Sequence, residues 1–186
     1  MNYLSYYPYC WYNRVRSWYH LRYPREGSIS KIREHIFISD FAASFDKEHL
    51  KELGITHILT VISGVSPAYP DDFQYMNISL QDSKNEFIDG ELFEQSHKWI
   101  KNAIDQKGNV LIHCSFGVSR SVTFAIAYLC HEYGMAPETA LMSIQCKRPQ
   151  ANPIPNYIDS LDKHYTKEKR MNLIKKKDFV NEILFH

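Results

Sequence analysis

The sequence predicts an α/β protein with a central, mostly parallel twisted sheet of about four or five strands, flanked by helices on both faces. Short apolar runs rich in β-branched residues alternate along the chain with stretches of helical spacing. Apolar residues make up 44% and charged residues 23% of the 186 residues, which is an ordinary globular balance for one domain. No segment repeats another, so a repeat architecture is not expected.

Four short runs are the predicted strands. The run His57–Ile62 is rich in β-branched residues and is typical of a strand that is buried on both faces. The predicted strands cover residues 35–39, 57–62, 75–80 and 110–112. Gly64 and two prolines make Ser63–Asp72 a loop. Because strands alternate with helices along the chain, the strands should pair in parallel and end at a common edge of the sheet.

The predicted helices are marked by start and stop residues. Asp89 is placed to cap a helix that runs to about Gln106, and Gly134 to end one that begins near Ser119. Pro137 suits the first turn of the next helix. The full set of predicted helices covers residues 46–53, 89–106, 119–133, 137–147 and the end of 152–161.

The two ends of the chain differ in composition from the middle. The first 28 residues carry seven tyrosines and two tryptophans, and we interpret them as an arm that packs on the domain surface, with a dimer contact as the alternative. The segment Lys163–Lys177 holds seven basic residues against one acid. A solvated helix face is its simpler interpretation, and a docking surface for anions is the alternative.

Charge and apolar pattern exclude several classes of protein. The formal net charge is +1, so the chain is neither a uniformly basic nucleic-acid coat nor an acidic tail. No apolar run approaches the ~20 residues of a membrane span, and the N-terminal residues lack the pattern of a secretory signal. We therefore expect a cytoplasmic protein, with the nucleus as a second compartment. The four cysteines are far apart in the sequence, which predicts reduced thiols and no zinc site.

The informative stretch is His113-Cys114-Ser115-Phe116-Gly117-Val118-Ser119-Arg120-Ser121. It lies where a buried strand ends and a helix begins, so several backbone N–H groups and the positive end of the helix dipole should converge on one anion. Gly117 allows the loop to curl. Cys114 lies at the base of this cradle, which should stabilise its thiolate and make it a strong nucleophile.

The other polar side chains of this stretch complete a phosphate site. The planar Arg120 guanidinium can hold two phosphate oxygens at once, and the Ser121 hydroxyl could stabilise the Cys114 sulfur as a leaving group. His113 supports the nucleophile from the end of the strand. We expect Cys114 to be exposed and sensitive to peroxide. The remaining cysteines, Cys10, Cys130 and Cys146, are expected to be ordinary buried thiols.

A leaving oxygen needs a proton donor, and the first candidate is Asp82. It follows the predicted strand 75–80, whose end should lie on the same edge as the end of 110–112. Asp71 and Asp72 lie before that strand, at the wrong end, and Asp89 is a helix cap. Glu86 is a weaker rival.

On these residues the chain resembles the dual-specificity protein phosphatases, and in particular their small atypical members, within the cysteine-dependent tyrosine phosphatase superfamily. Residues 113–121 match every fixed position of the family pattern HCxxGxSRS. The resemblance covers about residues 29–165 and includes Leu53–Leu59 and Lys147-Arg148-Pro149. It implies a catalytic domain at 29–165, between the aromatic arm 1–28 and a basic, helical C-terminal tail 166–186. Ile154 stands where the family often has an asparagine, which puts the packing behind the loop in question.

The resemblance implies a reaction with no metal and no organic cofactor. Cys114 attacks phosphorus while Asp82 protonates the leaving oxygen, and water then releases phosphate from the cysteine. The loop residues Ser115, Phe116, Gly117, Val118, Ser119 and Arg120 are expected to bind the phosphate group. The expected partners are phosphorylated protein substrates, with a homodimer through the aromatic arm as a further interpretation and no nucleic acid.

Several other functions remain open on the same loop. Phosphoinositide phosphatases tend to carry lysines at the variable loop positions. Here these positions are Ser115, Phe116 and Val118, which add no charge and make a lipid substrate less expected. An RNA 5′-phosphatase fits poorly with a near-neutral chain, and no carbohydrate-binding module is evident. A phospho-binding module with lost chemistry is disfavoured because Cys114, Arg120 and Asp82 are all present.

Overall fold

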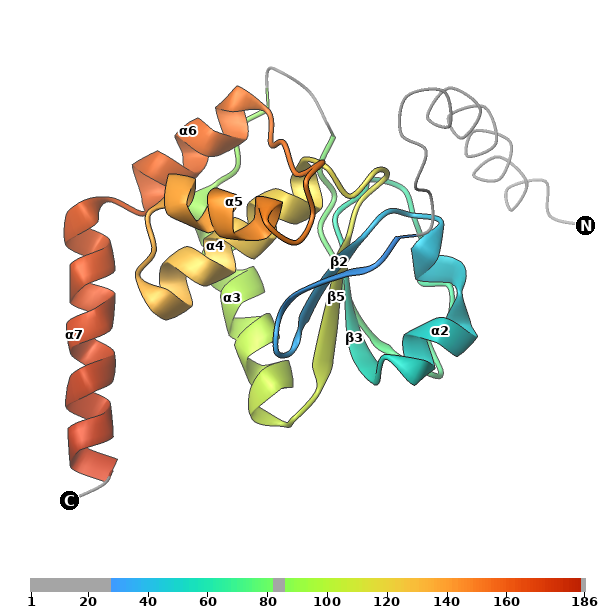
Figure 1. Ribbon diagram of the computed structural model, residues 1–186, viewed down its shortest axis with the longest axis horizontal. Helices are drawn as coiled ribbons and strands as arrows, with labels where there is room; N and C mark the ends of the chain where they lie inside the picture. The colour runs from blue at the N-terminus through green and yellow to red at the C-terminus, as the bar shows by residue number, and fades with distance from the viewer. Residues whose placement is uncertain (1–27, 82–85, 185–186) are drawn as a thin grey trace, which may run out of the picture.

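The computed structural model describes residues 28–81 and 86–184, with side chains as far as Lys177. Its core is a five-stranded sheet in the order β1-β2-β5-β3-β4, in which β1 is antiparallel to β2 and the other neighbours are parallel (Figure 1). The strands are β1 (Ser30–Arg33), β2 (Ile36–Ser39), β3 (Ile55–Thr60), β4 (Gln74–Asn77) and β5 (Asn109–His113). The mostly parallel sheet predicted from the sequence is confirmed.

Helices cover the sheet on both faces, as expected, but unequally (Figure 1). The short α2 packs on one face over a small cluster that includes Phe37, Leu50 and Leu111. The larger core, on the other face, takes in most of the buried side chains of α3 and α4. The helices are α2 (Lys47–Glu52), α3 (Gly90–Asp105), α4 (Arg120–Tyr133), α5 (Pro137–Gln145), α6 (Pro155–His164) and α7 (Lys167–Leu184), with a 3-10 turn η2 (Ala43–Phe45).

The strand register places three polar residues side by side at one edge of the sheet. Ser39 at the end of β2 and Thr60 at the end of β3 both pair with His113 at the end of β5. β4 also ends at this edge, where the N–H of Ile78 donates to the Thr60 carbonyl at 2.8 Å. The predicted common edge for the strand ends is therefore present.

The predicted helix signals act at the predicted places. The Asp89 side chain accepts the N–H of Glu91 at 3.0 Å and begins α3, and Pro137 stands in the first turn of α5. Gly134 ends α4 in the left-handed conformation, with φ of 63°. Local side-chain chemistry therefore determines where these helices begin and end.

The N-terminal edge of the sheet differs from the sequence prediction. The predicted strand 35–39 corresponds to β2, but the sequence did not predict β1 before it, and the two strands form a hairpin in which Lys31 pairs with Phe37. The connecting residues Glu34 and His35 include none of the glycine, proline or asparagine residues that usually mark a tight turn. Residues 1–27 of the aromatic arm, which was predicted at 1–28, lie outside the described residues.

The basic segment 163–177 is held against the body by several contacts. Lys169 Nζ lies 2.8 Å from Glu94 on α3, and Lys177 Nζ donates to the Glu132 carbonyl of α4 at 2.7 Å. Ile174 packs where a side chain on Gly134 would stand. Lys169 and Lys177 therefore attach the segment to α3 and α4, whereas Lys167, Lys175 and Lys176 are exposed to solvent. Among the described helices, none is long and apolar enough for a membrane span.

Candidate active site

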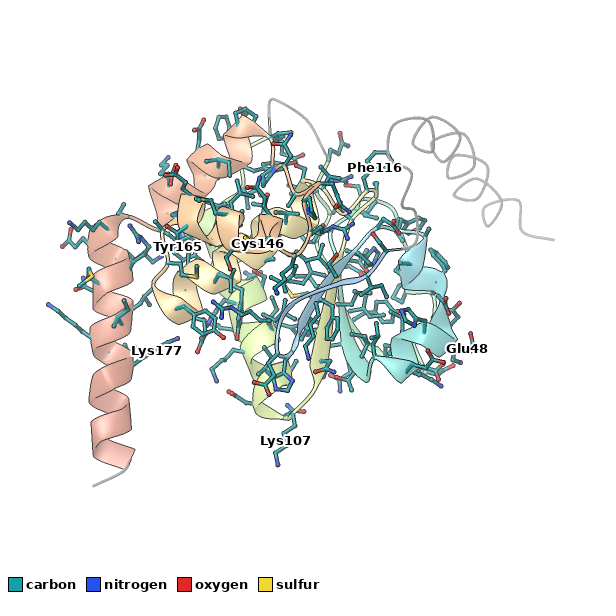
Figure 2. The ribbon with its side chains drawn as sticks, viewed as in Figure 1. Glu48, Lys107, Phe116, Cys146, Tyr165 and Lys177 are labelled. Carbon is teal, nitrogen blue, oxygen red and sulfur yellow. The ribbon has the colours of Figure 1, made fainter. Side chains whose placement is uncertain are left out.

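The loop between β5 and α4 curls around the sulfur of Cys114. Cys114 Sγ accepts the N–H of Gly117 at 3.2 Å and lies 3.3 Å from the hydroxyl of Ser121 in the first turn of α4. Cys114 is only 1% exposed, so the sulfur lies at the base of the loop and the expectation of an exposed thiol is wrong. Phe116, on the loop, and Lys107, before β5, mark opposite ends of that strand (Figure 2).

Gly117 is required at its position for two reasons. Its φ of 63° lies in the left-handed region that other residues rarely adopt. A β-carbon there would also overlap the Ser39 carbonyl and the guanidinium of Arg148. The glycine thus allows the curl that the sequence predicted and lets β2 and Arg148 approach the loop closely.

Neighbouring backbone holds the outer side of the loop. The N–H of Phe41 donates to the Ser115 carbonyl at 3.2 Å, and the N–H of Asn152 donates to the Val118 carbonyl at 2.8 Å. Ser119, at the N-cap position of α4, accepts the N–H of Ile154 on its hydroxyl at 3.3 Å. The segment in which Ile154 replaces the usual asparagine therefore still braces the loop, through its backbone.

The guanidinium of Arg120 reaches across the mouth of the loop. Nη2 donates to the hydroxyl of Ser115 at 2.9 Å, and Nη1 donates to the carbonyl of Leu80 at 3.0 Å. The side chain is 6% exposed, so these contacts hold the guanidinium in one orientation. A planar cation in this orientation is suited to bind two oxygens of one phosphate group.

His113 lies directly behind the nucleophile position and is neutral. Its Nε2 is 2.8 Å from Thr60 Oγ1, within hydrogen-bonding distance, and its ring stacks on Phe41 at 6.0 Å. Burial, and next the positive charge of Arg120, lower the pKa of His113 to about 3. The residue therefore supports the loop without adding a second positive charge to it.

The segment that leads to the predicted acid is fixed at two points. Arg120 holds the Leu80 carbonyl, and Tyr157 of α6 donates its hydroxyl to the Gln81 carbonyl at 2.6 Å. Asp82 itself lies outside the described residues. The rival Glu86 already accepts the N–H of Gln81 at 2.8 Å.

Two of the other candidate acids, Asp72 and Asp89, have structural partners away from the loop. Asp72 pairs with Lys47 at 2.5 Å and with Lys51 at 2.6 Å, on the α2 side of the molecule. These ion pairs lower the pKa of its carboxyl group. Asp89 caps α3 as expected. Within residues 28–81 and 86–184, no cluster of three or more histidine, cysteine or acidic side chains is arranged to hold a metal ion.

The remaining cysteines separate into two kinds. Cys130 is buried in α4, so the prediction of a buried thiol is confirmed, and burial raises the pKa of this thiol to about 12. The same prediction is wrong for Cys146, which directly follows the last residue of α5 and is exposed. Cys10 lies outside the described residues.

Sequence reasoning missed three side chains that the fold brings to the loop. Thr60 contacts His113, Tyr157 donates its hydroxyl to the Gln81 carbonyl, and Arg148 donates its Nε to the Gly117 carbonyl at 2.7 Å. Arg148 belongs to a segment that the family resemblance had already marked. Its role was not evident, because an arginine before a proline carries no local sign of what it binds.

Comparison with known proteins agrees with this geometry. Residues 36–167 match the family model described as "Dual specificity phosphatase, catalytic domain". The chain belongs to the dual-specificity phosphatase family. Dual specificity protein phosphatase 1B of Arabidopsis thaliana is 39% identical over 133 residues, which cover 72% of this chain and 79% of that protein. This family membership makes the chain a protein phosphatase of the cysteine-dependent type.

Solved structures of dual-specificity phosphatases share the fold. The crystal structure of DUSP15 superposes with a TM-score of 0.72 at 26% identity and covers 79% of this chain and 95% of that one. A human tyrosine phosphatase-like serine/threonine/tyrosine-interacting protein matches with a TM-score of 0.70 at 25% identity, over 73% of this chain and 94% of that chain. The loop at 113–121 lies within residues 36–167, the stretch that matches the family model.

Proposed function

We propose that this phosphatase hydrolyses phosphotyrosine and phosphoserine or phosphothreonine in proteins through a cysteinyl-phosphate on Cys114. The observation that carries the proposal is the position of the Cys114 sulfur. It lies at the base of a loop whose Gly117 N–H points at it from 3.2 Å, next to the first turn of α4. Backbone donors and a helix N-terminus in this arrangement stabilise both the thiolate and the oxyanion it attacks.

In the first step the thiolate forms a bond to phosphorus and the bond from phosphorus to the substrate oxygen breaks. The leaving oxygen takes a proton from a carboxylic acid, for which we propose Asp82. Two contacts favour this choice, because Arg120 and Tyr157 hold the carbonyls of the two preceding residues beside the loop. Charge on the three remaining phosphate oxygens is met by the loop amides and by Arg120.

In the second step water attacks phosphorus and the bond to sulfur breaks. The water proton passes to the Asp82 carboxylate, which regenerates the acid, and orthophosphate leaves. The thiolate of Cys114 is then the leaving group, and the hydroxyl of Ser121, 3.3 Å away, is placed to donate a hydrogen bond to it.

The loop favours phosphoproteins over phosphoinositides as substrates. Its variable positions are Ser115, Phe116 and Val118, which add no positive charge, and the Ser115 hydroxyl is engaged by Arg120. The exposed lysines of α7 belong to a different element from the loop. The loop therefore lacks the additional cations that would favour binding of an anionic lipid headgroup.

A phospho-binding module without turnover is the second candidate, since a structural neighbour carries the name of a phosphatase-like interacting protein. Against this interpretation, Cys114 lies beside the Ser121 hydroxyl, and Arg120 binds Ser115 of the same loop. An assay with para-nitrophenyl phosphate and phosphotyrosine and phosphothreonine peptides separates the two. We expect turnover that is unaffected by chelators and abolished by Cys114→Ser. Tight peptide binding without turnover between pH 5 and 8 under reducing conditions would leave only the binding module.

A further inference from the structure

Arg148 is buried more deeply than its charge would suggest. Its side chain is 0% exposed, in the turn that follows α5. Nε donates to the Gly117 carbonyl at 2.7 Å, while Nη1 donates to the Ser28 carbonyl and the Ser30 hydroxyl, each at 3.1 Å. Burying a guanidinium is costly unless its hydrogen bonds are satisfied. The contacts therefore connect the phosphate loop to the start of β1 through one side chain.

The direction of the Gly117 carbonyl decides where the next amide points. In a trans peptide unit the C=O and the following N–H lie on opposite sides, and the described chain has no cis peptide bond. Because Arg148 holds the Gly117 carbonyl on the outer side of the loop, the N–H of Val118 is directed to the inner side. The inner side is where the Gly117 N–H meets the Cys114 sulfur.

Two backbone contacts act in the same way on neighbouring peptide units. Phe41 holds the Ser115 carbonyl, which directs the N–H of Phe116 inward, and Asn152 holds the Val118 carbonyl, which directs the N–H of Ser119 inward. These two restraints are made by main-chain N–H groups. The restraint on Gly117 is made by a side chain, so a single substitution can remove it.

We propose that Arg148, outside the signature loop, is a positioning residue of the phosphate site, which orients the Val118 amide toward the bound oxyanion by holding the Gly117 carbonyl. The inference rests on the proposed function of the loop. It assigns to Arg148 an effect on phosphate affinity and turnover that is separate from its contribution to stability. It also predicts that the contact to Gly117 matters more for catalysis than the contacts to Ser28 and Ser30.

The test compares the full-length wild type with Arg148→Met and a matched control, Arg170→Met. Arg170 also donates to two backbone carbonyls, those of Tyr165 and Gly134, but at the junction of α4 and α7. Binding of inorganic tungstate, a tetrahedral oxyanion, is measured by calorimetry, and thermal unfolding and the kcat and KM for para-nitrophenyl phosphate are recorded for each protein.

We expect Arg148→Met to weaken tungstate binding and to lower kcat/KM by about 10- to 100-fold, the value of one hydrogen bond to a charged group. Arg170→Met should lower the unfolding temperature and leave tungstate affinity within about twofold of the wild type. Ser30→Ala should likewise change tungstate affinity by no more than about twofold. Tungstate affinity in folded Arg148→Met equal to that of the wild type would overturn the inference, as would an equal loss in Arg170→Met.

If Arg148→Met does not fold, Arg148→Lys replaces it. A lysine keeps the charge but cannot serve Gly117 and both serines with one ammonium group, so an affinity clearly below that of the wild type is expected. Wild-type affinity in a destabilised Arg148→Lys would contradict the proposal. If the wild type binds tungstate but hydrolyses nothing, the proposed function fails while the comparison of Arg148 variants still stands.

Discussion

The hydroxyl of Ser121 lies 3.3 Å from the sulfur of Cys114, in the first turn of α4, the helix that follows the phosphate loop. This contact joins the nucleophile to a buried hydroxyl of the helix. It is placed to act when sulfur leaves phosphorus, because a hydrogen bond to the charged thiolate is stronger than one to the neutral sulfur of the cysteinyl-phosphate. The two steps of the reaction should therefore respond differently to its removal.

Ser121→Ala should slow the breakdown of the cysteinyl-phosphate more than its formation. Stopped-flow measurement with para-nitrophenyl phosphate should show a burst of nitrophenol, followed by a steady rate that is lower by roughly tenfold. Ser96→Ala is a matched control, since Ser96 is a buried serine of α3 whose hydroxyl donates to its own helix, to Phe93. A uniform slowing with no burst would assign Ser121 a purely structural role.

Asp82→Asn should reduce kcat for a phosphotyrosine peptide by about 10²–10⁴-fold if Asp82 is the general acid. Glu86→Gln is the control from the same loop, and its smaller effect follows from the existing contact of Glu86 with the Gln81 N–H. The effect of Asp82→Asn should shrink with a good leaving group such as nitrophenol. A larger loss in Glu86→Gln than in Asp82→Asn would transfer the acid role to Glu86.

Gly117→Ala should abolish most of the activity, since the new β-carbon overlaps the Ser39 carbonyl and Arg148 and the loop must open to relieve this. We expect kcat/KM to fall by at least about 100-fold, as when an oxyanion donor is lost. Gly64→Ala is a close control, because Gly64 has φ of 72° but no atom within 4 Å of its would-be β-carbon. Comparable loss in both variants would show that backbone strain alone, and not the packing behind the loop, sets the activity.

Acid should destabilise the fold partly through His113. Its pKa is about 3 in the folded protein and near 6.5 when unfolded, so the unfolded chain binds the extra proton. The free energy of unfolding should fall as pH drops below about 6.5, by roughly 2 kcal/mol from this group at pH 5. Urea unfolding of the wild type and His113→Gln at pH 7 and 5 measures this. The loss of unfolding free energy between pH 7 and pH 5 should become smaller in His113→Gln. It should persist in the control His49→Gln, which replaces an exposed histidine on α2. A loss in His113→Gln as large as that of the wild type would contradict the assignment.

The sequence was sufficient to predict what depends on neighbours along the chain. The residues from Cys114 to Ser121 are close in sequence, so their type and spacing alone predicted a curled loop at a strand end, and Asp89 and Gly134 marked helix ends in the same local way. Arg148 could not be assigned, because the Gly117 carbonyl it binds is supplied by a distant part of the chain.

The sequence predicted the exposure of side chains and the pairing of edge strands less well than the residues of the phosphate loop. Cys130 and Cys146 looked alike in sequence, yet one points into the core from α4 and the other follows the end of α5. The hairpin of β1 and β2 was missed because its stability comes from pairing across the sheet edge and not from a recognisable turn. In both cases the deciding contacts are tertiary.

The most direct test of the central claim is to trap the phosphorylated enzyme. Ser121→Ala is mixed with a phosphotyrosine peptide, quenched in acid within the burst phase, digested and examined by mass spectrometry. A phosphoryl group should be found on the fragment that contains Cys114, and none in the Cys114→Ser form of the same protein. Steady turnover with no phosphoryl group on Cys114, or with one on another residue, would contradict the proposal that its sulfur is the nucleophile.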